Sequence, residues 1–355
     1  MVKIISKITL IGLFVISNFT LLMAQADSVI QAEVLDSDST LAQKLYNSGI
    51  EKFAQKDYDG AVADFDEAIS LISGFEKAFY NRGVTKYELK EYKGAIVDFD
   101  SSLALTQNPD SYFSKAQALY ALGEKENALD NYSKAIETNK EHFQAYYYRG
   151  GIRFENGEYE AAIQDYDAAI TLKKAYAYAY NDRGSAKRQL EDYAGAIRDY
   201  QKALMIDNKM SFAHNNLGSA LRKNGDYRAA IVSFSKAIDL DENYFIAYNN
   251  RGSAKYDAED YKGALEDYSK ALEIKNDYIY AWNNRAAAKF KLKDYKGCVE
   301  DCSKAIVLDS SYGYAYLNRG NAKELLRDEN GACVDWKKAV ELGAEGAKAH
   351  IGSCQ

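Results

Sequence analysis

The sequence is poor in the residues that most often carry catalysis or bind metals. It contains three histidines, four cysteines and one proline in 355 residues. The histidines and cysteines do not fall at the spacing of a metal site, and no Gly-rich phosphate loop or nucleophile motif is present in the sequence. We therefore expect a protein that is not an enzyme and that has no catalytic residues, no metal site and no cofactor.

The charge balance is also unfavourable for binding nucleic acids. Lysine and arginine total 45, aspartate and glutamate total 52, and the net charge is −7. Nucleic-acid binding needs a basic surface that neutralises phosphates. Beyond the N-terminal segment, no apolar run is long enough to span a bilayer. We expect no nucleic acid partner and no membrane insertion once that segment is removed.

The N-terminal segment has the organisation of a secretory signal peptide. Two lysines precede an apolar run that ends at Met23, and Ala24-Gln25-Ala26 supplies the small residues of a cleavage site. A retained membrane anchor is the alternative. We predict a signal peptide at 1–26, a linker at 27–41 that ends in helix-capping Asp and Ser, and export to the periplasm or secretion.

The rest of the chain repeats itself. Strings such as YNDRGSAKRQLEDYAGAIRDYQKALMI and YNNRGSAKYDAEDYKGALEDYSKALEI recur with a period of 34 residues, or 33 in one case. We number the positions of each repeat from 1 to 34. The nine predicted repeats are 42–75, 76–108, 109–142, 143–176, 177–210, 211–244, 245–278, 279–312 and 313–345, and a capping helix with a tail follows at 346–355.

Small and aromatic residues recur within each repeat at helical spacing. Position 8 is always Gly or Ala, position 20 is Ala in eight repeats, and position 24 is aromatic in eight. Small residues let two helices approach closely, and the rings fill the space between hairpins. Because one hairpin cannot bury its apolar face alone, neighbours must stack. The sequence predicts an all-α chain of nine antiparallel helix pairs without a β-sheet.

This pattern resembles the tetratricopeptide repeat family over residues 42–346. The resemblance implies a right-handed superhelical solenoid in which the first helix of each repeat lines a concave groove that binds proteins or peptides. One departure is that position 32, commonly proline in the family, is never proline here. The C-terminal sequence looks like the closing segment of exported repeat proteins from Bacteroidota-type bacteria.

Asparagine is frequent at position 6, which we expect to face the groove. It is a mediocre helix former, but its amide both donates and accepts hydrogen bonds and so suits an extended peptide backbone. The row resembles the asparagine ladders by which some family members grip peptides, although a family habit with only solvent contact is the alternative. The predicted groove residues are Asn47, Asn81, Asn216, Asn250, Asn284 and Asn318, their neighbours Asn215, Asn249 and Asn283, and a basic spot of Arg188, Arg222 and Lys223. The basic spot suits an acidic side chain or a C-terminal carboxylate.

Positions 7 and 23 change together. Six repeats have Arg at 7 and Asp at 23, whereas the sixth repeat has Leu217 with Ser233 and so loses both charges. We predict partly buried, structural ion pairs between the two helices of a repeat. They are Arg82 with Asp98, Arg149 with Asp165, Arg183 with Asp199, Arg251 with Asp267, Arg285 with Asp301, and Arg319 with Asp335.

The four cysteines fall into two pairs. Cys298 and Cys302 replace core residues of the eighth repeat, and we expect buried free thiols. Cys333 and Cys354 come level if the capping helix runs back along the last repeat helix, because the two paths are of nearly equal length at about 1.5 Å per residue. An oxidising compartment favours the bond, so we predict a disulfide between Cys333 and Cys354.

Two functional hypotheses follow. The leading one is a non-catalytic scaffold that acts outside the cytoplasm and grips extended peptide segments in its concave groove. The alternative is an envelope-structural or assembly component that uses the ends and ridges of the stack.

Overall fold

The computed structural model describes residues 31, 36–352 and 354. The predicted signal peptide, 1–26, lies outside the described residues. Most of the predicted linker also lies outside them, but its described part at 36–41 is helical and continues to residue 54, so the first helix begins before residue 42. The reason is that Ala42 is fully buried against Ala68 and Ala78, and a helix anchored by such packing extends readily through its polar neighbours.

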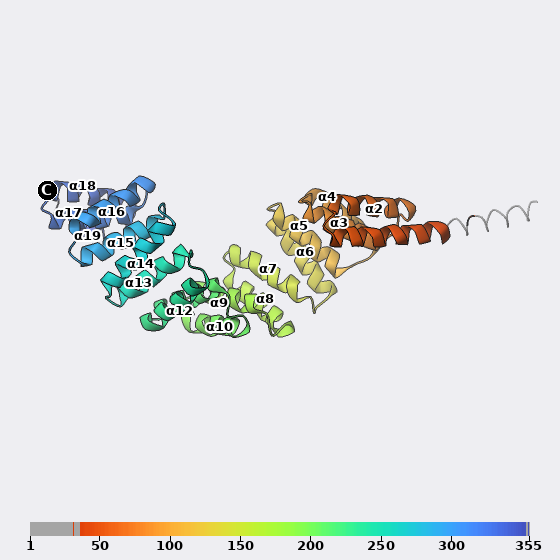
Figure 1. Cartoon of the computed structure of the whole chain (residues 1–355), viewed down its shortest axis with the longest axis horizontal. Coiled ribbons are helices and arrows are strands. Elements are labelled where there is room, and N and C mark those ends of the chain that lie inside the picture. The colour runs from red at the N-terminus through yellow and green to blue at the C-terminus, as the bar shows by residue number, and fades with distance from the viewer. Residues whose placement is uncertain (1–30, 32–35, 353, 355) are drawn as a thin grey trace, which may run out of the picture. The chain divides into compact units, whose positions relative to one another are not determined.

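The secondary structure of the described residues is entirely helical, and they contain no strand (Figure 1). The first helices of repeats two to nine are α3 (Glu76–Glu88), α5 (Pro109–Ala121), α7 (Phe143–Glu155), α9 (Ala177–Gln189), α11 (Ser211–Lys223), α13 (Phe245–Asp257), α15 (Ile279–Lys291) and α17 (Gly313–Leu325). The second helices of repeats one to nine are α2 (Tyr58–Leu71), α4 (Tyr92–Leu105), α6 (Lys125–Thr138), α8 (Tyr159–Leu172), α10 (Tyr193–Ile206), α12 (Tyr227–Leu240), α14 (Tyr261–Ile274), α16 (Tyr295–Leu308) and α18 (Glu329–Glu341), and α19 (Lys348–Ile351) follows as the capping helix. The all-α prediction is confirmed, and the first helices of repeats two to nine begin at the first position of their repeat.

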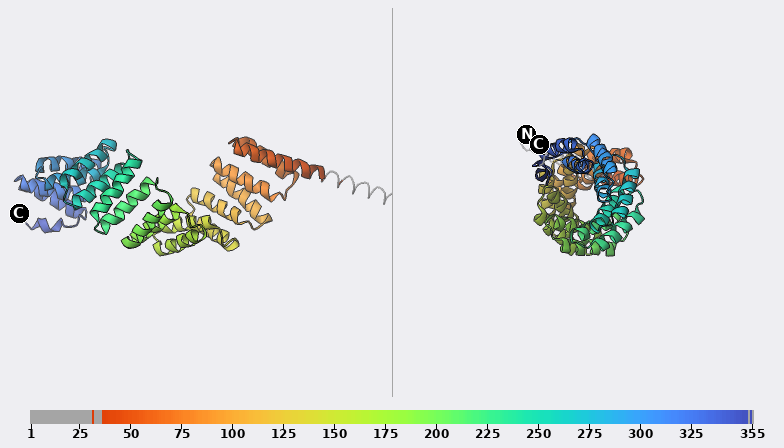
Figure 2. Two further views of the ribbon diagram at one scale, coloured as in Figure 1. Left: turned by 60° about the horizontal axis from the view of Figure 1, so that its bottom comes forward. Right: turned by 90° about the vertical axis from the view of Figure 1, so that its left-hand side faces the viewer.

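The chain divides into two compact bodies between Ile152 and Arg153, inside α7. We call the described residues up to 152 the N-terminal body and those from 153 onwards the C-terminal body, and each is described by itself. In the C-terminal body, consecutive helices from α8 to α19 pack side by side (Figures 1 and 2). The stack follows directly from the repeated small and aromatic positions.

The first helices of the C-terminal body lie on the inner side of its stack. Helix α9 contacts α11, α11 contacts α13, α13 contacts α15, and α15 contacts α17. From residue 153 to residue 352, the second helices of neighbouring repeats make no comparable contacts. The side on which successive repeats meet is the shorter side of a curved stack, so side chains of the first helices line the inner surface.

Close contact between positions 8 and 24 holds the two helices of a repeat together. The position-24 rings are buried, and Tyr268 is 2% exposed. A methyl group added to Gly252, at position 8, would lie 2.8 Å from the Tyr268 ring and 3.2 Å from the Ala264 carbonyl oxygen. In the eighth repeat the contact is relaxed on both sides, because Ala286 faces Cys302 in place of a ring.

We therefore expect Gly252→Ala to lower the free energy of unfolding by about 1–3 kcal/mol, the usual cost of overpacking a dense core. Gly151→Ala is the matched control. Gly151 is also within a helix, but no atom lies within 4 Å of an added methyl group, so alanine there should stabilise by about 0.5–1 kcal/mol through helix propensity. Urea unfolding followed by circular dichroism checks both, and equal effects at the two sites would contradict the close-packing interpretation.

Candidate functional site

Asparagines of neighbouring repeats form a hydrogen-bonded ladder in the C-terminal body. Each position-6 amide nitrogen donates to the position-5 amide oxygen of the preceding repeat. The four bonds run from Asn216 to Asn181 at 3.1 Å, from Asn250 to Asn215 at 3.0 Å, from Asn284 to Asn249 at 3.0 Å, and from Asn318 to Asn283 at 2.9 Å. The ladder therefore connects five successive first helices, α9 to α17.

The position-5 asparagines belong to the packing between helices. Asn215, Asn249 and Asn283 are only 5–7% exposed, and their amide oxygens accept the ladder bonds. A buried amide needs such a partner, because an unpaired one costs free energy. The structure thus corrects the prediction that these three residues line the groove.

The position-6 asparagines remain available to a ligand. Asn216, Asn250, Asn284 and Asn318 are all partly exposed, and each uses one amide hydrogen in the ladder. Within the described chain, the second amide hydrogen of each has no partner, and only Asn250 has its amide oxygen engaged, by Asn249 at 3.5 Å. Each rung therefore still offers a donor, and three also offer an acceptor.

The N-terminal body uses position 6 differently. Asn81 donates to the Tyr46 hydroxyl at 3.0 Å and to the Lys77 carbonyl at 2.9 Å. Asn47 is exposed and accepts from Gln43 at 2.9 Å. Position 5 carries a ring in these repeats, so a neighbouring amide is missing. The structure does not bring Asn47 or Asn81 into a ladder.

The predicted basic spot is less basic than its sequence indicates. The Nε atom of Arg222 donates to Asp257 Oδ2 at 2.6 Å, and this carboxylate was not anticipated. Lys223 is exposed. Arg188 lies beside the hydroxyl of Tyr200, where it offsets part of the pKa rise that burial gives this tyrosine. Only Lys223 and Arg188 thus remain without an opposing carboxylate among the described contacts.

Arg222 and Asn284 meet at one pocket on the inner surface, with a volume of about 170 Å³. The other lining residues are Ser253, Tyr256, Asp257, Tyr268 and Ala287. The Tyr268 hydroxyl donates to Ser253 Oγ at 3.2 Å, and Ser253 Oγ donates to the Asn249 carbonyl at 3.0 Å. Burial raises the pKa of Tyr268, so its hydroxyl stays protonated and keeps this bond.

The predicted Arg–Asp pairs are formed within each body with two hydrogen bonds apiece, at 2.5–3.0 Å. They join Arg82 to Asp98, Arg183 to Asp199, Arg251 to Asp267, Arg285 to Asp301, and Arg319 to Asp335. The remaining predicted pair would join Arg149 of the N-terminal body to Asp165 of the C-terminal body. Because each body is described by itself, no contact between these two residues is given. Asp165 does accept from Arg153 at 2.8 Å.

A third residue completes each charge cluster, and the sequence analysis missed it. A position-11 lysine lies 2.7–2.9 Å from the same carboxylate in five repeats, namely Lys86, Lys187, Lys255, Lys289 and Lys323. The signal was present in the repeat alignment, because the repeats that lack this Asp have Leu119 and Leu221 at position 11. The conserved unit of charge within this chain is therefore a triad.

The arginine of each triad also reaches the preceding repeat. Arg251, Arg285 and Arg319 donate to the hydroxyls of Ser235, Ser269 and Ser303 at 3.0–3.3 Å. The same guanidinium groups lie over the position-4 rings, 4.7–5.5 Å from the ring centroids. The bonds to serine join each of the three repeats to the repeat that precedes it.

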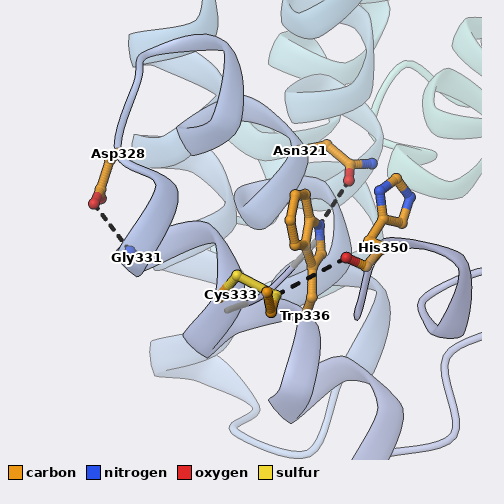
Figure 3. Close-up of a disulfide and its surroundings, with 7 residues drawn as sticks. Asn321, Asp328, Gly331, Cys333, Trp336 and His350 are labelled. Atoms are coloured by element: carbon orange, nitrogen blue, oxygen red, sulfur yellow. Dashed lines mark hydrogen bonds between the residues drawn. A yellow bond between two sulfur atoms is a disulfide. The ribbon is translucent and has the colours of Figure 1, made fainter. Parts of the chain in front are cut away.

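Cysteine chemistry is confined to the end of the chain. Cys298 and Cys302 are buried free thiols, and Cys333 is joined to Cys354 by a disulfide (Figure 3). Beside it, His350 stacks on Trp336 with ring centroids 4.8 Å apart, and Trp336 donates to Asn321 at 2.9 Å (Figure 3).

In the described part of the chain, no group of three His, Cys, Asp or Glu side chains is placed to hold a metal. None of the described helices is both long enough and apolar enough to cross a membrane.

Comparison with known families and structures agrees with this architecture. Profiles of the tetratricopeptide repeat match residues 113–181, 177–210 and 279–312, and a TPR repeat profile matches 218–258 and 252–293. None of the curated proteins matches the sequence.

Several solved structures share the fold at low sequence identity. A tetratricopeptide repeat protein from Parabacteroides merdae is 17% identical with a TM-score of 0.57, over 69% of this chain and 98% of that chain. The C-terminal part of a TPR repeat-containing protein from Cytophaga hutchinsonii is 22% identical with a TM-score of 0.50, over 78% and 99%. Pseudomonas aeruginosa pilF is 17% identical with a TM-score of 0.52, over 59% and 95%. The family profiles together cover more than half of the chain. The chain therefore belongs to the tetratricopeptide repeat family, in agreement with its repeats and helix pairs.

Proposed function

We propose that the protein is a non-catalytic scaffold that binds extended peptide segments along the inner surface of its C-terminal body. The observation that carries this proposal is the row of partly exposed position-6 amides, one from each of four successive repeats. Each amide offers hydrogen-bonding groups that match a peptide backbone of any sequence.

The ladder supports the proposal because it holds these amides in place before a ligand arrives. Each position-6 side chain is tied to a buried asparagine of the preceding repeat, so its free donor keeps a fixed direction. A preorganised group loses little conformational entropy on binding. Four such rungs on a rigid stack favour an extended segment over a compact ligand.

We also propose that the protein acts outside the cytoplasm, in the periplasm or as a secreted protein. The lysine-led apolar segment that ends in Ala24-Gln25-Ala26 supports export. The Cys333–Cys354 disulfide is of a kind that persists mainly in oxidising compartments.

The binding proposal predicts different outcomes for neighbouring asparagines. Asn250→Ala with Asn284→Ala removes two exposed rungs and should weaken binding of an extended peptide by about tenfold or more, at roughly 1.4 kcal/mol or above for two hydrogen bonds. Peptides are first selected from a displayed random library on residues 27–355. Affinities are then measured by fluorescence anisotropy.

Asn249→Ala with Asn283→Ala is the matched control. It also breaks two ladder bonds, so its loss of unfolding free energy should be similar, but it removes no exposed group. It loosens Asn284 and Asn318 but leaves their amides in place, so its peptide affinity should fall by no more than about threefold, a difference of less than 1 kcal/mol. If the two variants lose affinity equally, the position-6 amides do not contact the peptide. If the library selects nothing, the ends and ridges become the working surface, as in an envelope-structural or assembly component.

A further inference from the structure

The pocket beside the third rung of the ladder has a wall made of opposite charges. Arg222, from α11, and Asp257, from α13, have side chains that are 34% and 28% exposed. Their bond joins Arg222 Nε to Asp257 Oδ2 at 2.6 Å. Among the described residues, the terminal nitrogens of Arg222 and the Oδ1 atom of Asp257 have no hydrogen-bond partner. The wall therefore presents free donors and a free acceptor next to each other.

The remaining walls fit the end of a side chain. The volume of about 170 Å³ is far above the roughly 15 Å³ that one water molecule needs. Tyr256 and Ala287 supply an aromatic and an aliphatic surface, and Asn284 places its ladder amide at the same pocket. The hydroxyls of Tyr268 and Ser253 bond to each other, so this part of the lining needs no ligand partner.

The charge arrangement disfavours an ionic ligand. A carboxylate that approaches Arg222 also meets Asp257, and an ammonium group that approaches Asp257 also meets Arg222. Either ion loses hydration without a net counter-charge, which costs free energy in a partly enclosed site. An aliphatic side chain would cover the free donors and acceptor without pairing them. A primary carboxamide avoids both costs, because it is neutral and carries an acceptor oxygen beside an NH2 donor.

In the C-terminal body, a pair of opposite charges such as Arg222 and Asp257 occurs between only one pair of neighbouring repeats. Arg222 is at position 12 of its repeat, and Asp257 is at position 13 of the following repeat. At the neighbouring steps Arg188 is followed by Lys223, Tyr256 by Lys291, and Phe290 by Leu325. The rungs recur along the stack, whereas the opposite charges mark a single place where a particular side chain can be recognised.

We propose that this pocket selects a glutamine or asparagine side chain of the bound segment, with Arg222 donating to its carbonyl oxygen and Asp257 accepting from its NH2 group. This inference rests on the proposed binding of extended peptides to the ladder. It adds a sequence preference to a surface that otherwise reads only the backbone.

The test uses peptides selected from the random library on wild-type protein. We expect selected peptides to share Gln or Asn at one position. In anisotropy measurements, replacing that residue of the peptide by Glu, Lys or Leu should weaken binding at least about tenfold, the effect of losing hydrogen bonds to charged groups.

Two variants separate recognition from a structural role. Asp257→Asn leaves a net positive wall and should shift the preferred peptide residue from Gln to Glu. Arg222→Gln leaves a net negative wall and should shift it from Gln to Lys. A purely structural pair would weaken all four peptides by the same factor. Melting curves identify a variant that does not fold, in which case the charge exchange Arg222→Asp with Asp257→Arg, which should keep the Gln preference, decides the question.

The outcomes distinguish this inference from the proposal on which it rests. If peptides are selected and the ladder variants weaken them, but no Gln or Asn is enriched, peptide binding stands and the carboxamide pocket is overturned. A Gln preference that both single-charge variants leave unchanged also overturns it. If no peptide is selected, both fail together.

Discussion

Asp267→Ser is expected to lower the free energy of unfolding by about 3 kcal/mol, the lower end of the range for breaking a buried ion pair. Asp267 is 4% exposed, accepts two bonds from Arg251 at 2.7 and 2.9 Å, and lies 2.9 Å from Lys255. The substitution leaves two partly buried cations without a carboxylate. Their side chains keep 19–20% exposure, which limits the loss. Urea unfolding of the C-terminal body measures this loss of unfolding free energy.

The chain provides its own control for this experiment. In the sixth repeat, the three positions of the triad are Leu217, Leu221 and Ser233, and Leu217 packs with Tyr200 and Ala220. Copying this solution as Arg251→Leu, Lys255→Leu and Asp267→Ser should recover most of the stability lost in the single variant, because apolar replacement of a whole buried ion cluster is often neutral. A triple variant as unstable as the single one would show that the triad itself stabilises the repeat.

The repeat fold was predictable because the sequence carries its own alignment. The nine copies show that position 8 is always small and that position 24 is aromatic in eight of them, which is the pattern that packing of the helix pairs requires. The alignment of the repeats also contains information on the Arg–Lys–Asp triads. The loss of Asp at position 23 accompanies the change from Lys to Leu at position 11, so the sequence alone contains the information that these residues form one cluster.

The candidate site was only partly predictable, for geometric reasons. Positions 5 and 6 are neighbours on one helix and both are rich in asparagine, so periodicity could not decide which faces solvent. The contacts decide it, since Asn249 and Asn283 are buried while Asn284 stays partly exposed. Likewise, Arg222 and Asp257 are 35 residues apart. Their pairing depends on the packing of α11 against α13, which the pattern of one repeat does not contain.

The second large effect is expected at the C-terminal end. Cys354→Ser removes the disulfide to Cys333, which closes a loop with a sequence separation of 21. For a loop of this length, the loss of cross-linking should cost about 3 kcal/mol. Because α19 has only four residues, the loss should appear first as local opening of α18 and α19. Hydrogen exchange followed by mass spectrometry measures this opening.

The consequence of opening follows from what α19 covers. His350 stacks on Trp336, and Ala347 is fully buried in a cluster with Ala339 and Ala344. The last repeat of a stack has no following repeat to cover its apolar face, so it depends on such a cap. Reduction of the wild-type protein should reproduce the exchange pattern of Cys354→Ser, and reductant should add nothing to the variant, although Cys298 and Cys302 remain in both. Exchange in α9–α12 should stay unchanged. If α18 is equally protected with and without the disulfide, packing alone closes the stack, and the cross-link has no part in its stability.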